Sequence, residues 1–243
     1  MRQVKMRYMT PGLSPRRTKL EIPGWAGDRS PRADGAREQV WHCTPFSEGA
    51  QYGIEIFYPF DFELRATTRE GKLHIEGEFG EPPAPGLQWP PFRNFGDAYY
   101  TYQVLLDINP GDGYAIRTEP HPRFYSDVTG TCPIAVPALI RNWWPMMFFM
   151  VFKSPGEGQT HVFRPGEPMA QLLVIPETAE FELTEMTPEE QAERELRSRR
   201  IHAARSTVTA DTTWRSSTHT VFDGTYRHMA RAAKAKTMKG SEP

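Results

Sequence analysis

Two short polar clusters hold the residues of this chain that could bind a ligand. In the first, Arg141, Asn142, Trp143 and Trp144 are consecutive and open a run of apolar residues. An arginine can hold an anion through its guanidinium group, and a tryptophan can stack on a planar ring. The cluster predicts a ligand platform. The alternative is that the tryptophan pair is packed in the core or at a subunit interface.

The second cluster is the segment RTEPHPR, which contains Arg117, Glu119 and His121. A histidine between two prolines is either a loop residue or a base or metal ligand. We group Arg117 and His121 with the first cluster as the candidate pocket of a ligand-binding or enzymatic domain. Gln171 joins them as a candidate, because a glutamine in a buried strand can reach across a subunit interface.

A metal site of the cupin type is a further alternative. GQTHVFRPGEPM superficially echoes the second cupin motif, although the histidine expected after Pro165-Gly166 is missing. A 2-His-1-carboxylate iron site would need two histidines and a carboxylate to converge. The candidates are His42, His74, His121, His161 and Glu167. A cupin-like Fe(II) oxygenase stays as the second alternative, but we predict no cofactor and no metal.

Covalent catalysis and nucleotide hydrolysis by a P-loop lack support, because neither Gly-x-Ser-x-Gly nor a P-loop pattern is present. Cys43 follows His42 directly. Adjacent residues of a strand point to opposite faces, so we do not expect these two side chains to meet.

Strands must position these residues. The densest apolar stretch, 136–176, holds one run from Trp143 to Phe152 and another from Met169 to Ile175. Both are short, rich in aromatic and β-branched residues, and bounded by Pro and Gly, which is typical of buried strands. Further strand-like segments are 40–46, 52–67, 72–79, 99–108 and 109–120.

Within 52–67, Ile54 and Ile56 alternate with Glu55 and Phe57, which predicts a half-buried strand. Pro and Gly recur about every ten residues along these segments, a spacing typical of a sandwich or barrel. We therefore expect an all-β body, of β-clip or sandwich/barrel-like type, with an irregular N-terminal arm and a C-terminal helical tail.

The expected domain organisation has three parts: a basic irregular arm at 1–40, the β-rich body at 41–186, and a basic helical tail at 187–243. The tail begins with a capping box, with Thr187 as N-cap, Pro188 at the first helical position and Glu190 as partner. The arm is rich in Arg, Pro and Gly, and it is too polar to bury a core of its own.

Charge separates these parts. The whole chain has 243 residues and a net charge of −1, but residues 1–40 and residues 188–240 each carry a net charge of +5, and the body is acidic. Basic arms can bind nucleic acid or fold onto an acidic surface. We expect the second, because neither arm interleaves aromatic residues as a single-strand binder does.

We therefore expect self-association, as a dimer or trimer, with the arms held through Leu20, Ile22 and Trp25. Exposed charges are screened beyond about 8 Å at physiological salt, so these apolar anchors must carry most of the contact. A small molecule is the other expected partner, and nucleic acid and membrane are not expected.

Two cysteines far apart, Cys43 and Cys132, argue against a disulfide framework and a structural zinc. The sequence shows neither a signal-peptide pattern nor an apolar run of membrane-spanning length. We expect a cytoplasmic protein.

The order of several motifs resembles an uncharacterised bacterial family that is known only as a domain of unknown function. The motifs are CTPFSEGAQYGIEIFYPFDFEL, FGDAYYTYQV, GYAIRTEPHPR and FRPGEPMAQLLVIP, and the resemblance covers about residues 43–186. The resemblance therefore identifies related proteins, but it does not imply a chemical reaction.

A more distant resemblance is to the dUTPase and dCTP-deaminase β-clip fold. The counterparts of its motifs would be PGDGYAIRT, ALIRNWW and PGEPMAQLLVIP. The family's catalytic Asp would fall at Arg141, and an arginine cannot act as a general base at neutral pH. We therefore expect a ligand-binding domain for a small anionic or nucleotide-like molecule, without dUTPase chemistry. The alternative is an oligomeric structural or interaction protein.

Overall fold

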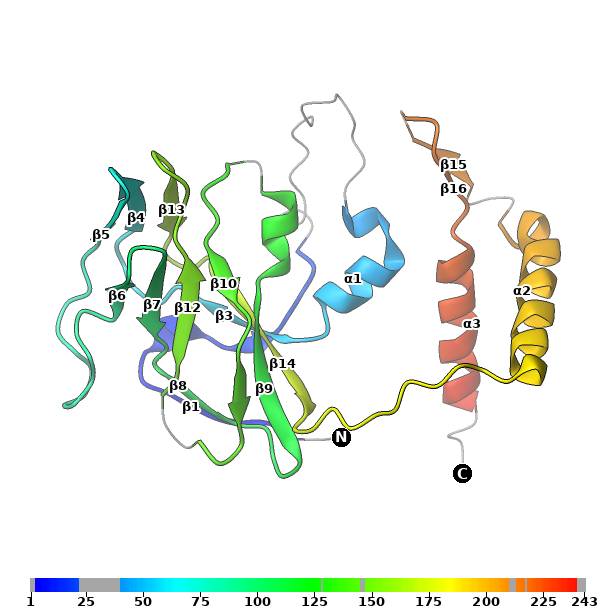
Figure 1. Ribbon diagram of the computed structural model, residues 1–243, viewed down its shortest axis with the longest axis horizontal. Helices are drawn as coiled ribbons and strands as arrows, with labels where there is room; N and C mark the ends of the chain where they lie inside the picture. Colours follow the sequence, from blue (N-terminus) through cyan, green and yellow to red (C-terminus); the bar gives the residue numbers. More distant parts are fainter. Residues whose placement is uncertain are drawn as a thin grey trace. The chain divides into compact units, whose positions relative to one another are not determined.

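The computed structural model describes residues 3–21, 40–127, 129–144, 147–209, 213–216 and 218–239. It confirms the expected class, an all-β body with a C-terminal helical tail, and of the expected N-terminal arm it describes residues 3–21 (Figure 1). The chain divides into two compact units, which are described separately. The first comprises Met1–Asp28 and Glu48–Ala179, and the second comprises Arg29–Ser47 and Glu180–Pro243.

The first unit is built from strands β1 to β14. They are β1 (Lys5–Tyr8), β2 (Arg16–Arg17), β3 (Ile54–Phe57), β4 (Leu64–Arg69), β5 (Lys72–Glu76), β6 (Phe92–Phe95), β7 (Tyr99–Gln103), β8 (Leu106–Asn109), β9 (Tyr114–Pro120), β10 (Ile134–Val136), β11 (Leu139–Arg141), β12 (Phe149–Lys153), β13 (Thr160–Phe163) and β14 (Pro168–Pro176). Two 3-10 helices, η1 (Pro11–Leu13) and η3 (Pro122–Ser126), also belong to it.

The largest sheet has the strand order β11-β9-β14-β3-β2, and all of its pairs are antiparallel. Its longest strand, β14, lies in the middle and pairs with β9 on one side and β3 on the other. A four-stranded sheet, β10-β12-β7-β6, and a three-stranded sheet, β13-β4-β5, complete the body. The strand β14 is mostly apolar on both faces, and its residues from Pro168 to Leu172 are buried, as the sequence predicted for a strand covered on two sides.

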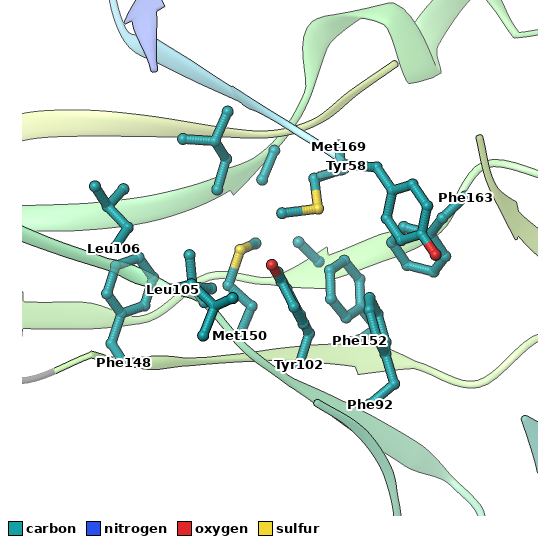
Figure 2. Close-up of a cluster of buried hydrophobic side chains, with 14 of the residues drawn as sticks. Tyr58, Phe92, Tyr102, Leu105, Leu106, Phe148, Met150, Phe152, Phe163 and Met169 are labelled. Atoms are coloured by element: carbon teal, nitrogen blue, oxygen red, sulfur yellow. The ribbon is translucent and has the colours of Figure 1, made fainter. Parts of the chain in front are cut away.

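A single aromatic-rich core joins the three larger sheets. Figure 2 shows Tyr58, Phe92 and Tyr102 beside Phe163 and the methionines Met150 and Met169. Phe92 and Tyr102 stack with centroids 4.4 Å apart. Aromatic rings packed against one another therefore fill much of this core.

The segment 134–141 passes from one sheet to another. Its first half, β10, pairs with β12, and its second half, β11, pairs with β9. Pro137 lies between them and has no N–H to donate. Thr118 bridges the break: its N–H donates to Ala138 O at 2.9 Å, and its Oγ1 accepts from Ala138 N at 2.8 Å. The break places β11 at the edge of the large sheet.

The described part of the N-terminal arm is attached to the first unit. β1 pairs with β8, and β2 pairs with β3. Leu13 is fully buried and Leu20 is half-buried. The other two expected anchors, Ile22 and Trp25, lie outside the described residues.

The second unit contains η2 (Val40–His42), α2 (Pro188–Val208), the hairpin of β15 (Trp214–Arg215) and β16 (Val221–Phe222), and α3 (Thr225–Lys239). The capping box is confirmed: Glu190 N–H donates to Thr187 Oγ1 at 3.3 Å, and Thr187 N–H donates to Glu190 Oε2 at 2.8 Å. None of the described helices has the length and apolarity that a bilayer span requires.

Two expectations about elements were wrong. Residues 40–46 are not a strand, because η2 is followed by α1 (Thr44–Ala50), whose second residue is the helix-starting Pro45. The run from Trp143 to Phe152 is not one strand either. β12 begins only at Phe149, and Trp144 N–H donates to Arg141 O at 3.0 Å in a turn.

Candidate functional site

A row of four polar side chains crosses the large sheet on the face opposite the core. Arg16 of β2 pairs with Glu55 of β3, Glu55 with Gln171 of β14, and Gln171 with Glu119 of β9. Directly paired residues lie on the same face of a sheet. Glu55 is fully buried there, although the alternation of its strand predicted an outward position. Arg16, in the N-terminal arm, contacts the Glu55 carboxylate on this face.

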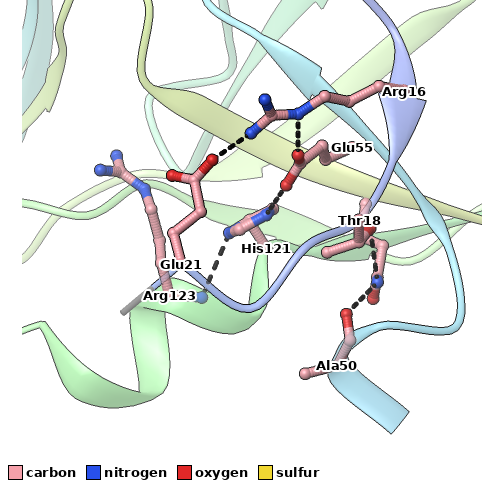
Figure 3. Close-up of polar contacts among 8 residues, drawn as sticks. Arg16, Thr18, Glu21, Ala50, Glu55, His121 and Arg123 are labelled. Atoms are coloured by element: carbon pink, nitrogen blue, oxygen red, sulfur yellow. Dashed lines mark hydrogen bonds and ion pairs between the residues drawn. The ribbon is translucent and has the colours of Figure 1, made fainter. Parts of the chain in front are cut away.

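The carboxylate of Glu55 is held from two directions (Figure 3). One oxygen accepts from Nε of Arg16, whose Nη2 also pairs with Glu21, and the other contacts Nε2 of His121 at 3.1 Å. Hydrogen bonds to both oxygens satisfy a charge that would otherwise be costly to bury. The carboxylates beside Arg16 raise the pKa of its guanidinium, and the largest cause is the hydrogen bond that Arg16 donates to Glu55.

His121 ends β9 and caps η3. Its Nδ1 accepts from the backbone N–H of Arg123 at 3.2 Å, so the ring proton belongs on Nε2, which then donates to Glu55. Burial lowers the pKa of the ring, against the opposing effect of Glu55. The imidazole is therefore neutral with a defined tautomer, and both nitrogens are engaged within the chain. This geometry is that of a structural link and not of a base facing a substrate.

Gln171 is also committed to contacts within its own unit. Its amide donates to Thr18 Oγ1 at 3.0 Å and to Ala50 O at 2.8 Å, and the residue is 4% exposed. Gly53 leaves the space for it, because a Cβ there would lie 2.5 Å from Gln171 Cγ. The amide thus ties the arm and the end of α1 to β14.

The first polar cluster of the sequence, at 141–144, borders a surface hollow of about 370 Å³. We call it the tryptophan hollow, and the residues that line it are Leu139, Ile140, Arg141, Trp143, Trp144, Met147, Phe148 and Phe149. Trp143 is 69% exposed and Trp144 is 41% exposed, so the reading of this pair as core is wrong. Their rings meet edge to face at 6.1 Å.

Arg141 is the last residue of the edge strand β11, and it lines the hollow. Its Nη1 donates to Glu177 Oε1 at 3.2 Å and weakly to Glu177 O at 3.4 Å. Neighbouring Asn142 donates to Asp112 Oδ1 at 3.2 Å and is outside the lining. The hollow therefore combines an apolar floor, two exposed indoles and one guanidinium.

The structure does not gather all the predicted site residues in one pocket. Arg141 pairs with Ala115, whereas His121 directly follows β9 and is six residues beyond Ala115, about 20 Å away at the rise of a strand. Arg117 is between them but turns to Glu119, with Nε 2.6 Å from Oε1. Only Arg141, Trp143 and Trp144 come together. The buried cluster of Arg16, Glu55 and His121 is the feature that sequence reasoning missed.

The histidines considered for iron are dispersed. In the described part of the chain, no group of three or more His, Cys, Asp or Glu side chains is placed to hold a metal. His161 receives a hydrogen bond at Nδ1 from Tyr100, 3.0 Å away, and burial lowers its pKa to about 4. Glu167 pairs with Arg123 at 2.9 Å.

No protein-family model matches the chain, and no curated protein matches it. The likeness to a family of unknown function stays a prediction. Among solved structures, the chain is similar to a dUTPase from phage phi11 of S. aureus, with a TM-score of 0.37 and 10% identity. The match covers 76% of this chain and 98% of that one, and at this TM-score it carries no conclusion about fold or chemistry.

Proposed function

We propose that the first unit is a ligand-binding β domain whose tryptophan hollow takes a small anionic molecule with a planar ring, of the nucleotide-like class. The observation that carries the proposal is the joint presence of Arg141 and the exposed indoles of Trp143 and Trp144 around one hollow. Exposed tryptophans are expensive to leave in water, and their faces are suited to stacking on a base.

The guanidinium supplies the complementary charge. Its pairing with Glu177 is solvent-exposed, and such pairs are worth about 0–1 kcal/mol. A phosphate can accept two parallel hydrogen bonds from the guanidinium of Arg141, and it therefore competes well with the carboxylate of Glu177. The ring of the ligand would then stack on an indole while its anionic group replaces Glu177.

Binding is favoured over catalysis because the described lining offers no Asp, Glu, His, Ser or Cys that could transfer a proton or attack a substrate. Arg141 also occupies the position at which the resemblance would place a catalytic Asp.

Titration of the protein with nucleoside monophosphates, followed by tryptophan fluorescence, tests the proposal. Nucleosides and inorganic phosphate serve as partial ligands, and each should bind more weakly than the complete nucleotide. Arg141→Ala should weaken binding about tenfold or more, since hydrogen bonds to charged groups are worth about 1.5–3 kcal/mol. Trp143→Ala should remove about 1–3 kcal/mol of stacking.

Arg65→Ala is the matched control, because Arg65 is an exposed, ion-paired arginine outside the hollow. It should bind as the wild type does. Nucleotide binding that is unchanged in both Arg141→Ala and Trp143→Ala would contradict the proposal.

A second candidate is supported by the same exposure. Leu139, Trp143 and Phe149 form an apolar patch beside the edge strand β11, and such patches commonly mark interfaces between copies. Light scattering distinguishes the two. If Trp143→Glu converts an oligomer into a monomer, the hollow is an interface. If the wild type is already monomeric at micromolar concentration, the interface reading fails.

A further inference from the structure

A second cleft, on another side of the first unit's aromatic core, has the opposite electrostatic character. It encloses about 280 Å³ and is lined in part by Phe60, Phe79 and Trp89, with Leu105 beneath them. We call it the aromatic cleft. None of its lining residues belongs to the tryptophan hollow.

The three rings stand steeply to one another. Phe60 and Phe79 are 5.1 Å apart at 78°, Phe60 and Trp89 are 6.0 Å apart at 67°, and Phe79 and Trp89 are 6.3 Å apart at 81°. Rings at such angles and separations form a corner. One cation in the cleft can therefore lie within about 6 Å of all three centroids, which is the range of cation–π attraction.

The rings are held in place before any ligand binds. Trp89 Nε1 donates to Gly80 O at 2.7 Å, which fixes the indole. All three rings are partly buried against the main core, so one part of each is packed and the other part borders the cleft. A prearranged site of this kind loses little conformational entropy on binding.

Three carboxylates border the same cleft: Asp61, Glu78 and Glu81. All three are exposed, and none has an ion pair with a described residue. Among the described residues, no Lys, Arg or His lines the cleft. Three negative charges that have no ion pair with a described residue, placed around an aromatic corner, attract a cation and repel anions.

We infer that the aromatic cleft binds an organic cation with a trimethylammonium-like head. An inorganic cation would leave the rings without a role, and a neutral apolar ligand would leave the carboxylates without one. A methylated ammonium group uses both, because its methyl groups contact ring faces while its charge faces the carboxylates. The volume suits such a head group and not a whole nucleotide.

Calorimetric titration of the full chain with choline tests this inference. The neutral isostere 3,3-dimethyl-1-butanol has the same shape without the charge, and a trimethyllysine peptide distinguishes a protein-borne head group from a free one. We expect saturable millimolar or tighter binding of at least one of the two cations, and binding of the neutral alcohol at least fivefold weaker.

Glu78→Gln/Glu81→Gln should weaken cation binding up to about thirtyfold, since each of the two exposed charges contributes at most about 1 kcal/mol. Glu70→Gln, an exposed carboxylate outside the cleft, is the matched control and should leave binding unchanged. Arg141→Ala should also leave it unchanged, so this inference and the proposed function fail separately. Equal binding of choline and the alcohol, or no saturation by either cation, would overturn the inference.

Discussion

Glu55 and His121 are 66 positions apart in the sequence, yet their side chains meet at 3.1 Å with both residues fully excluded from solvent. The contact joins β3 to the residue that follows β9, and β14 lies between these two strands in the sheet. Arg16 completes it from the N-terminal arm. The arm is thus held by a buried, charged contact in addition to its apolar residue Leu13.

Glu55→Gln should destabilise the first unit by about 3 kcal/mol, because removing one partner of a buried ion pair leaves the others without compensation. Urea unfolding at neutral pH measures the loss. Glu119→Gln is the control, since Glu119 belongs to the same row but its partner Arg117 is half exposed. That variant should lose less than about 1 kcal/mol. Equal losses in the two variants would show that burial of Glu55 does not matter.

Gly53→Ala should destabilise the protein by about 1–3 kcal/mol, the range for overpacking a filled site. The new Cβ would meet Gln171 Cγ at 2.5 Å and Leu172 O at 2.8 Å. Gly49→Ala provides the contrast, because Gly49 lies in α1 with nothing within 4 Å of its Cβ position. That substitution should stabilise the helix by about 0.5–1 kcal/mol. Thermal melts of the two variants should therefore shift in opposite directions.

Stability should fall as the pH is lowered from about 6.5 to about 4. The folded state lowers the pKa of His161 from 6.5 to about 4 through burial, so within this window the unfolded chain binds more protons than the folded one. His121 acts in the same direction. The contribution of His161 reaches about 3 kcal/mol.

His161→Gln isolates that contribution. The difference in unfolding free energy between wild type and variant should shrink as the pH falls through the window, because the variant has no imidazole to protonate. A difference that is constant from pH 7 to pH 4 would assign the pH dependence to other groups.

Thr187→Ala should lower the stability of α2 by about 1 kcal/mol, because the hydroxyl satisfies the N–H of Glu190 at the start of the helix. Circular dichroism during urea unfolding measures the loss of helix. Ser198→Ala, in the middle of α2, should instead raise helicity slightly.

Local pattern was sufficient to predict much of the fold. The alternation of Leu73 and Ile75 with polar neighbours predicted β5, and the capping residues Thr187 and Glu190 predicted the start of α2. In both cases the relevant forces act within a few residues. The strand expected at 40–46 failed because the helix-starting effect of Pro45 outweighed the apolar and aromatic composition around it.

The buried cluster could not be predicted in this way. Glu55 alternates correctly with Ile54 and Ile56, and its pattern says only that it faces away from the core. Burial there depends on the cover provided by Arg16 and Thr18, which are about forty residues earlier and lie in a segment with no periodicity. The grouping of Arg141 with the two tryptophans could be predicted from the sequence because all three lie within four successive residues, which a single turn brings together.

The hydrogen bond from Gln171 to Thr18 spans 153 positions and has a consequence for synthesis. β1 must likewise wait for β8, to which it pairs through Lys5 and Asn109. During synthesis Thr18 therefore has no partner at Gln171 until β14 has been made, whereas Arg16 can pair with Glu55 much earlier. Contacts between residues so far apart in the sequence also slow folding. The N-terminal arm should therefore dock in stages, with β2 pairing to β3 early and the contacts to β8 and β14 forming only after those strands have been made.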